Sequence, residues 1–136
     1  MFIYLFNMQK DFNKWNHLKQ EIENYSRDLV IKEREIWWIN LWINIQTESC
    51  WKWEKFRRPV LVLKKLSHKN YIVIPLSTKI KTGSWFENYE INWIRYTALL
   101  YQIKMVNINR FYVNEYKMEY WKFLEIKKRL KQLLNL

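Results

Sequence analysis

The spacing of hydrophobic positions changes near residue 34 and divides the chain into two parts. Within residues 11–25 apolar side chains recur every three or four positions, with Lys, Asn and Glu between them, which predicts an amphipathic helix. The apolar stripe of this helix consists of Phe12, Trp15, Leu18 and Ile22. We therefore expect an N-terminal helical extension over residues 1–33, followed by a separate domain over residues 34–136.

Short runs rich in β-branched and aromatic residues predict strands in the second part. The predicted strands are residues 35–45, 60–66, 71–76, 85–91 and 97–106, separated by an exposed loop at 46–58, a turn at 67–70 and a second loop at 79–84. Pro59 opens the second strand, and Pro75 favours an edge position for the third.

A C-terminal helix completes the predicted elements. Its apolar face consists of Tyr120, Phe123, Ile126, Leu130 and Leu133, with Lys and Arg on the outer face. Several short strands followed by a helix predict a small curved sheet or β-barrel, mainly β with flanking helices at both ends.

Composition excludes several classes of protein. A length of 136 residues and a hydrophobic fraction of 49% fit one globular domain with a core. The single Cys cannot form an internal disulfide, and no Cys/His cluster has zinc-ligand spacing, so we expect neither metal nor cofactor. No apolar run approaches the ~20 residues that span a bilayer, and the apolar opening lacks a basic flank. We expect a cytoplasmic protein without a membrane partner.

Positive charge is concentrated in the middle of the chain. Residues 34–110 carry thirteen Lys/Arg against five Asp/Glu, whereas residues 1–33 carry five of each. This surplus points to a polyanionic ligand, either nucleic acid or an acidic protein. A basic surface that is merely solvated is the other interpretation, and composition alone does not choose between them.

Candidate chemistry is confined to polar residues at predicted strand ends. The two histidines, His17 and His68, fall on the predicted N-terminal helix and in a turn, so we interpret both as surface residues. If strands 60–66 and 71–76 pair through the turn, Arg58 lies at the same end of the hairpin as Ser77 and Thr78. A guanidinium beside hydroxyls can recognise phosphate, although Arg before Pro and Ser at a strand end are also ordinary surface features.

Four sequence segments in order resemble the MazF/PemK family of bacterial toxins. They are REIWWINL at 34–41, RRPVLVL at 57–63, IVIPLSTKIK at 72–81 and ALLYQIKMVNINRF at 98–111. The arginine–proline strand is the most diagnostic segment, Arg110 lies in the expected place, and the helix near 119–134 matches the terminal helix of the family. The resemblance covers about three quarters of the chain.

The resemblance implies an SH3-like or CcdB-like small β-barrel that works as a homodimer and is inhibited by an acidic cognate antitoxin. Such proteins are usually metal-independent endoribonucleases that cleave single-stranded RNA. The 2′-hydroxyl attacks the neighbouring phosphate, which leaves a 2′,3′-cyclic phosphate and a 5′-hydroxyl, and DNA lacks that hydroxyl. The alternative is a non-catalytic barrel that binds nucleic acid or protein, either a degenerate toxin or a CcdB-like topoisomerase inhibitor.

Roles for individual residues also follow from the resemblance. Arg58 is the expected catalytic arginine, and Ser77 stands where the family commonly has a catalytic Thr. Thr47 and Glu48 stand where the family has a Ser-Glu pair that contacts RNA, and Gln102 is a supporting residue near the groove. The remaining expected substrate-binding residues are Arg57, Thr78 and Lys79.

Glycine is nearly absent, and this departs from the family pattern. The chain has one Gly and nine Trp, against about nine Gly at average usage. Trp42, Trp51 and Trp53 stand where relatives have glycines. Either these rings stack on bases, as in single-strand binders, or they are glycines encoded by UGA and translated under the wrong genetic code. A UGG codon at these positions excludes the second hypothesis.

Overall fold

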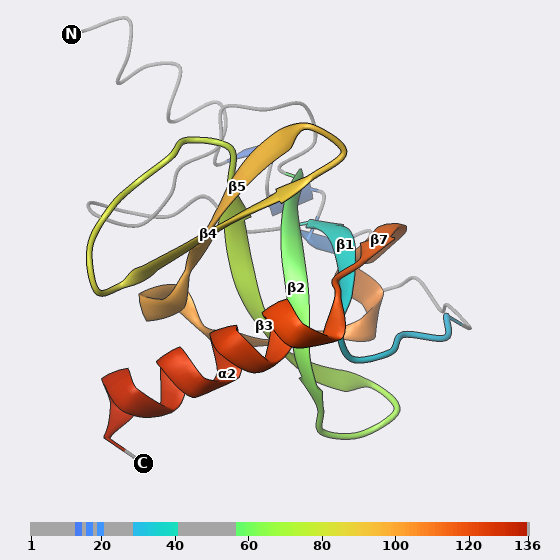
Figure 1. Ribbon diagram of the computed structural model, residues 1–136. Helices are drawn as coiled ribbons and strands as arrows, with labels where there is room; N and C mark the ends of the chain where they lie inside the picture. Colours follow the sequence, from blue (N-terminus) through green and yellow to red (C-terminus); the bar gives the residue numbers. More distant parts are fainter. Residues whose placement is uncertain (1–12, 15, 18, 21–28, 41–56, 136) are drawn as a thin grey trace, which may run out of the picture.

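The computed structural model describes residues 13–14, 16–17, 19–20, 29–40 and 57–135. Within these residues the chain forms a curved seven-stranded antiparallel sheet and a C-terminal helix (Figure 1). The elements are β1 (Glu35–Asn40), β2 (Arg57–Lys65), β3 (Asn70–Ser77), β4 (Phe86–Ile91), β5 (Ile94–Leu99), η2 (Leu100–Gln102), β6 (Lys104–Asn107), η3 (Ile108–Arg110), β7 (Phe111–Lys117) and α2 (Tyr120–Leu134).

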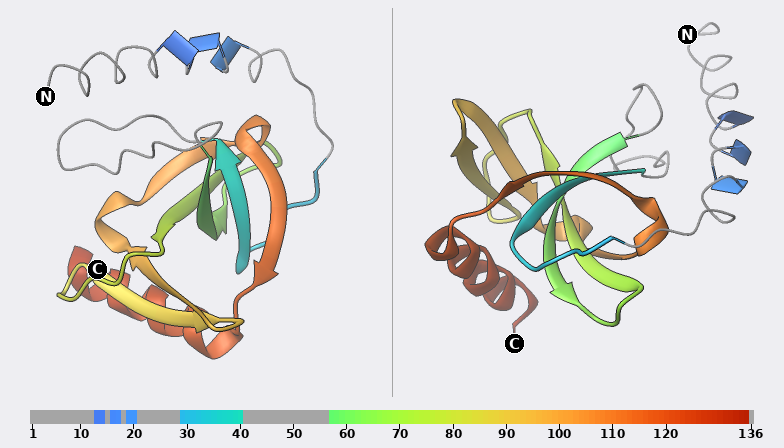
Figure 2. Two further views of the ribbon diagram at one scale, coloured as in Figure 1. Left: turned by 90° about the horizontal axis from the view of Figure 1, so that it is seen from above. Right: turned by 90° about the vertical axis from the view of Figure 1, so that its right-hand side faces the viewer.

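The strand order is β4-β5-β3-β2-β1-β7, and β6 pairs with β3 beside this path. Strand β3 therefore has two partners on one side, with β6 along residues 70–73 and β5 along residues 76–77. This change of partner bends the sheet, and the views in Figure 2 show it curled into a half-open barrel with α2 outside. The expected small β-barrel with a C-terminal helix is confirmed.

Two hydrophobic cores lie on opposite faces of the sheet. The first joins Leu61, Ile74 and Leu76 to Phe123 and Ile126 of α2. The second contains residues of alternate parity on the same strands, among them Trp37, Ile39, Val60, Val73 and Phe111. Because successive strand residues point to opposite faces, the nearly unbroken apolar runs in β2 and β3 reflect burial on both sides.

The central hairpin is confirmed, with a register shift between Val62 and Lys64, and its open end differs from the prediction. Strand β2 begins at Arg57, so Arg57 and Arg58 belong to the sheet instead of closing an exposed loop. Pro75 is not on an edge strand, because β3 pairs with β2 on one side. It is tolerated because it lies on the other side between the segments that pair with β6 and with β5, where no strand residue is its partner.

The predicted strand at 97–106 is wrong, because the chain turns in its middle. Strand β5 ends at Leu99, η2 follows, and β6 starts at Lys104. Because of this break, β5 pairs with the end of β3 and β6 pairs with its beginning. Strand β7 is not predicted by the sequence pattern, since most of its side chains are exposed and polar on this edge of the sheet.

The C-terminal helix is confirmed, with one exception on its predicted apolar face. Phe123, Ile126 and Leu130 are buried, whereas Tyr120 is 59% exposed and lies beneath the Arg34 guanidinium, 5.4 Å from ring centroid to Cζ. In the N-terminal segment residues 13–14, 16–17 and 19–20 have helical backbone and exposed side chains. The predicted stripe of Phe12, Trp15, Leu18 and Ile22 lies outside the described residues.

Candidate functional site

The candidate site is built around a buried cation at one end of the β2–β3 hairpin. Arg58 is only 1% exposed, the largest fully buried side chain among the described residues. Its Nε donates a hydrogen bond to the carbonyl oxygen of Leu76 at 3.2 Å. Burial lowers the pKa of the Arg58 guanidinium to about 10, and the nearby Tyr101 acts in the opposite direction. Arg58 is therefore a fixed cation that gives up a proton more readily than an ordinary arginine.

Ser77 lies across the hairpin from Arg58. Val60 pairs with Pro75 and Leu61 with Ile74, and continuing this register by two residues places Arg58 opposite Ser77. Directly opposed residues of an antiparallel pair share one face of the sheet. Ser77 is 6% exposed, and its Oγ accepts a hydrogen bond from the backbone N–H of Lys79 at 3.1 Å. The hydroxyl and the guanidinium thus lie on the same side of the sheet, whereas the sequence predicts only that they lie at the same end of the hairpin.

This polar row continues across two further strands. Ser77 pairs with Thr97 of β5, and Thr97 pairs with Asn88 of β4. The Thr97 hydroxyl is fully buried and donates a hydrogen bond to Asn88 Oδ1 at 2.6 Å. Four strands in order, β2-β3-β5-β4, therefore present Arg58, Ser77, Thr97 and Asn88 at neighbouring positions on one face.

Gln102 and Tyr101 come from η2, the turn that interrupts the strand predicted for this segment. Gln102 is 8% exposed, and its Nε2 donates a hydrogen bond to the Tyr101 hydroxyl at 3.1 Å. Tyr101 is 41% exposed and is electrostatically coupled to Arg58. Gln102 is thus linked to the buried arginine through the exposed phenol.

Arg57 is not brought together with Arg58. Strand alternation points the two side chains to opposite faces. The Arg57 guanidinium lies over the ring of Tyr112, 3.4 Å from Cζ to the ring centroid. Its backbone pairs with Asn40, whose carbonyl oxygen accepts a hydrogen bond from Arg110 Nη1 at 3.3 Å. Arg57 therefore lies on the other side of the sheet from Arg58, and Arg110 contacts the backbone at the end of β1.

The remaining predicted residues fall into three groups. Thr78 and Lys79 are exposed directly after Ser77. Thr47, Glu48 and the tryptophans at 42, 51 and 53 lie outside the described residues. His17 and His68 are both exposed, which confirms their interpretation as surface residues.

Sequence reasoning missed Thr97, Asn88 and Tyr101. The one available signal was Thr97, a polar residue within the buried run Tyr96–Leu100. A buried hydroxyl is costly without a hydrogen-bond partner, so a polar residue in such a run indicates that a partner lies nearby in the fold. Nothing in the sequence identifies Asn88 as that partner, because the pairing of β4 with β5 depends on a turn at 92–93.

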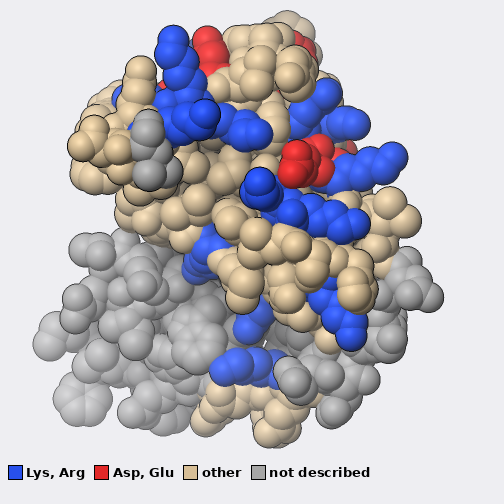
Figure 3. All heavy atoms as spheres, turned by 90° about the horizontal axis from the view of Figure 1, so that it is seen from below, with Lys and Arg blue, Asp and Glu red and all other residues tan. Residues whose placement is uncertain are grey.

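Positive side chains outnumber negative ones on one face of the molecule (Figure 3). Figure 3 shows Lys and Arg spread over the face viewed from below, with few Asp and Glu among them. Among the described residues no group of three or more His, Cys, Asp or Glu is arranged to hold a metal ion. Within the same part of the chain, no helix combines the length and hydrophobicity needed to cross a membrane.

Comparison with known proteins identifies the family. The family of PemK-like, MazF-like toxins of type II toxin–antitoxin systems matches residues 32–134. The chain belongs to this family. The matched region begins before β1 and ends with α2, so it contains the whole sheet and the row from Arg58 to Asn88. None of the curated proteins matches the sequence.

Solved MazF structures have the same fold at low sequence identity. MazF from Deinococcus radiodurans has a TM-score of 0.65 at 16% identity, covering 80% of this chain and 100% of that one. The MazE–MazF complex from the same organism has a TM-score of 0.62 at 16% identity, covering 80% and 99%. The Mycobacterium tuberculosis toxin MazF-mt6 has a TM-score of 0.59 at 13% identity, covering 76% and 98%. At this identity the likeness shows the fold of the PemK/MazF family alone.

Proposed function

We propose that this chain is the toxin of a type II toxin–antitoxin pair and cleaves single-stranded RNA, with Arg58 and Ser77 at the reacting phosphate. The observation that carries the proposal is the buried guanidinium of Arg58, held by the Leu76 carbonyl oxygen in the same row as Ser77. Burying a cation is costly, and strongly desolvated charged groups are concentrated at functional sites.

The proposed reaction needs only the RNA, the protein and solvent water. The 2′-oxygen forms a bond to the adjacent phosphorus, and the bond from phosphorus to the 5′-oxygen breaks. The 2′-hydroxyl loses its proton to solvent water, and the leaving 5′-oxygen gains one from Arg58, which solvent then reprotonates. Arg58 stabilises the charge that develops on the phosphate oxygens, and its lowered pKa also suits it to donate the proton to the leaving oxygen.

The other site residues bind the substrate in this proposal. Ser77 donates its hydroxyl hydrogen to a phosphate oxygen while its Oγ still accepts from the Lys79 backbone. Lys79 and Thr78 contact the phosphate backbone beside it. Gln102 orients Tyr101 through their hydrogen bond, and the exposed Tyr101 ring can stack on a base. Thr47 and Glu48 complete the RNA-contacting set in the family pattern.

The proposed partner is an acidic antitoxin, and the proposed assembly is a homodimer. A net charge of +11 suits both RNA and an acidic polypeptide, so the two ligands compete for the same cations. A solved mycobacterial endoribonuclease in complex with its cognate antitoxin has the same fold, with a TM-score of 0.59 at 10% identity over 79% of this chain and 97% of that one.

The test is cleavage of mixed-sequence single-stranded RNA in EDTA, with analysis of the new ends. We expect 2′,3′-cyclic phosphate and 5′-hydroxyl ends from the wild type. Arg58→Gln, which keeps a donor for the Leu76 carbonyl, should lose about 10²–10³-fold in rate. The control is a strand with 2′-deoxy substitution at the cleaved position, which should stay intact.

Three results contradict this function. Metal-dependent cleavage or 5′-phosphate ends exclude the proposed reaction. Equal rates for wild type and a folded Arg58→Gln exclude the assigned site. No cleavage by folded wild type supports a non-catalytic barrel that binds nucleic acid or protein, such as a CcdB-like inhibitor.

A further inference from the structure

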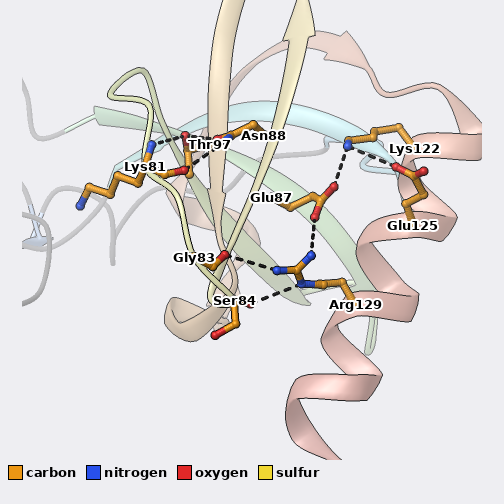
Figure 4. Close-up of polar contacts among 9 residues, drawn as sticks. All are labelled: Lys81, Gly83, Ser84, Glu87, Asn88, Thr97, Lys122, Glu125 and Arg129. Atoms are coloured by element: carbon orange, nitrogen blue, oxygen red, sulfur yellow. Dashed lines mark hydrogen bonds and ion pairs between the residues drawn. The ribbon is translucent and has the colours of Figure 1, made fainter.

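The segment between β3 and β4 is tied to the sheet at Lys81. Its backbone N–H donates a hydrogen bond to Thr97 Oγ1 at 3.2 Å, and its carbonyl oxygen accepts one from Asn88 Nδ2 at 3.2 Å. The Thr97–Asn88 bond of 2.6 Å closes the triangle (Figure 4). Both polar backbone atoms of one loop residue are therefore held by two side chains that are themselves bonded to each other.

This arrangement lies beside Ser77. Thr97 is the direct cross-strand partner of Ser77, so the hydroxyl that binds Lys81 occupies the next position in the same polar row. Thr97 is fully buried, and a buried hydroxyl is stable only when it is hydrogen-bonded. The Thr97 hydroxyl accepts its hydrogen bond from the Lys81 backbone N–H. The position of the loop and the satisfied hydrogen bonding of Thr97 therefore depend on each other.

A second anchor holds the far end of the loop. Arg129 of α2 donates from Nη2 to the Gly83 carbonyl oxygen at 3.3 Å and from Nε to that of Ser84 at 3.4 Å. Its Nη1 forms an ion pair with Glu87 at 3.5 Å. Figure 4 shows that these contacts lie on the α2 side of the loop, whereas the Lys81 side chain extends away from α2 and from the Thr97–Asn88 pair.

The Lys81 ammonium faces no carboxylate within ion-pair distance in the described part of the chain. Its Nζ lies 5.7 Å from the centroid of the Phe86 ring. A lysine whose backbone N–H and carbonyl oxygen are both held by neighbouring side chains, and whose ammonium has no carboxylate partner among the described residues, is suited to bind an anion with little ordering cost.

We propose that Thr97 and Asn88 are positioning residues that fix Lys81, so that its ammonium binds an RNA backbone phosphate next to the one at Ser77. This inference rests on the proposed RNA substrate. Thr97 and Asn88 contact no substrate themselves and act through Lys81.

The experiment is a double-mutant cycle on Lys81 and Thr97. Steady-state cleavage gives KM and kcat, and fluorescence anisotropy at several salt concentrations gives the Kd of a single strand made uncleavable by 2′-deoxy substitution. We expect Lys81→Gln to raise KM and Kd about 5–10-fold with kcat within twofold. It should also reduce the slope of log K against log salt by about 0.7, as for one lost phosphate contact.

Thr97→Val keeps the side-chain shape and removes both hydrogen bonds, so it should reproduce the Lys81→Gln effect. The double variant should be no worse than Lys81→Gln alone, since Thr97 acts only through that ammonium. Thr97→Ser keeps the hydroxyl and should restore binding to within twofold of wild type. The matched charge control is Lys128→Gln on the exposed face of α2, with Kd within twofold of wild type.

Additive effects in the double variant, or an unchanged Kd and salt slope in Lys81→Gln, overturn the inference. Should Thr97→Val fail to fold, Asn88→Ala at the exposed end of the triangle replaces it in the same cycle. Cleavage by the wild type tests the proposed reaction separately. If the wild type binds RNA without cutting it, the proposed nuclease activity is wrong, and the Kd values of the double-mutant cycle still test the role of Lys81. If the wild type binds no RNA, both proposals are wrong.

The two-residue turn between β4 and β5 has a backbone conformation that favours glycine. Ile91 pairs with Ile94, and the turn residues Asn92 and Trp93 have φ of 49° and 69°. Two positive φ values define the type I′ turn, for which Asn-Gly is the preferred sequence. Trp93 is 94% exposed, so its ring makes almost no contact that compensates for the unfavourable backbone.

We infer that residue 93 is glycine in the organism that makes this protein, because its codon is UGA and is read there as glycine. This backbone evidence is independent of the family pattern that raises the same hypothesis for Trp42, Trp51 and Trp53. Trp37 is the internal contrast, since it is buried at 5% exposure and packs edge-to-face on Phe111.

Sequencing the gene tests this inference. We expect UGA at codon 93 and UGG at codon 37, and a peptide from the natural protein with the mass of Gly at position 93. In recombinant protein, Trp93→Gly should raise Tm by about 3–8 °C, while Trp93→Ala, which keeps the β-carbon, should recover less. A UGG codon at position 93 overturns the inference.

Discussion

The two ends of the β2–β3 hairpin carry similar residues, but these residues differ in burial. At the closed end, Ser67 accepts a hydrogen bond from the backbone N–H of Lys69 at 3.3 Å, and the turn is exposed. At the open end, Ser77 accepts from the backbone N–H of Lys79 at 3.1 Å, but Ser77 and Arg58 are buried. The local bond is the same, so the difference lies in the desolvated cation. Polar turn formers make a surface loop at one end and a candidate phosphate site at the other.

Removal of each serine hydroxyl should affect the two ends of the hairpin very differently. Ser77→Ala should lower kcat/KM for RNA cleavage by about 10²-fold, because a phosphate contact at the reacting centre is lost. Ser67→Ala loses the same kind of local bond and should leave cleavage within twofold, with a loss of about 1 kcal/mol or less in the free energy of unfolding. Single-turnover rates and thermal melts measure both effects.

Ser77→Thr is the control that restores the hydroxyl, and it should keep cleavage within about threefold of wild type. Equal losses for Ser77→Ala and Ser67→Ala would mean that the two ends differ only in exposure. In that case the open end is an ordinary strand terminus.

The pH dependence of cleavage should report the buried cation. Because the pKa of Arg58 is lowered to about 10, kcat/KM should fall about tenfold per pH unit above pH 10, as the guanidinium loses its proton. A rate that stays level to pH 11 would contradict the role of Arg58 as a charged group in catalysis. Measurement on a strand with a single ribonucleotide, beside Arg58→Gln, corrects for alkaline hydrolysis.

The lowered pKa of Arg58 also makes the stability of the fold depend on pH. The folded-state pKa of Arg58 lies below the unfolded-state value, so the unfolded chain holds more protons above pH 10. The contribution of Arg58 to the free energy of unfolding therefore rises with pH in that range. Below pH 10 the buried charge is a cost, so Arg58→Gln should unfold at the same temperature as wild type or higher at pH 7, while losing activity.

The hairpin could be predicted from the sequence because its determinants are local. Apolar runs on either side of the turn at 67–70 predict the hairpin and bring Arg58 and Ser77 to the same end of it. A register shift between Val62 and Lys64 then determines that Arg58 lies opposite Ser77. The break after Leu99 could not be predicted in this way. It exists because β3 is shared between β5 and β6, a property of the whole sheet rather than of residues 97–106.

The burial of Arg58 was also beyond sequence reasoning. Two arginines before a proline are typical of an exposed loop, and only the sheet shows that one of them is buried and the other lies over Tyr112. The Thr97–Asn88 pair is equally hard to predict from the sequence, since the Thr97 hydroxyl has a hydrogen-bond partner only once β4 pairs with β5. Buried polar positions depend on contacts distant in sequence, and these are the positions where the candidate chemistry lies.

Tyr101, the exposed neighbour of the buried Arg58 cation, should have only a modest influence on cleavage. Tyr101 raises the pKa of Arg58, against the larger effect of burial. Tyr101→Phe removes the hydroxyl that accepts from Gln102 and keeps the ring for base stacking. We expect the alkaline limb of the pH profile to move to lower pH, and the rate at pH 7 to fall no more than about threefold, since Arg58 remains charged there. An alkaline limb that moves upward would show that Tyr101 does not act on Arg58, and Gln102 would then have no route to the reacting phosphate.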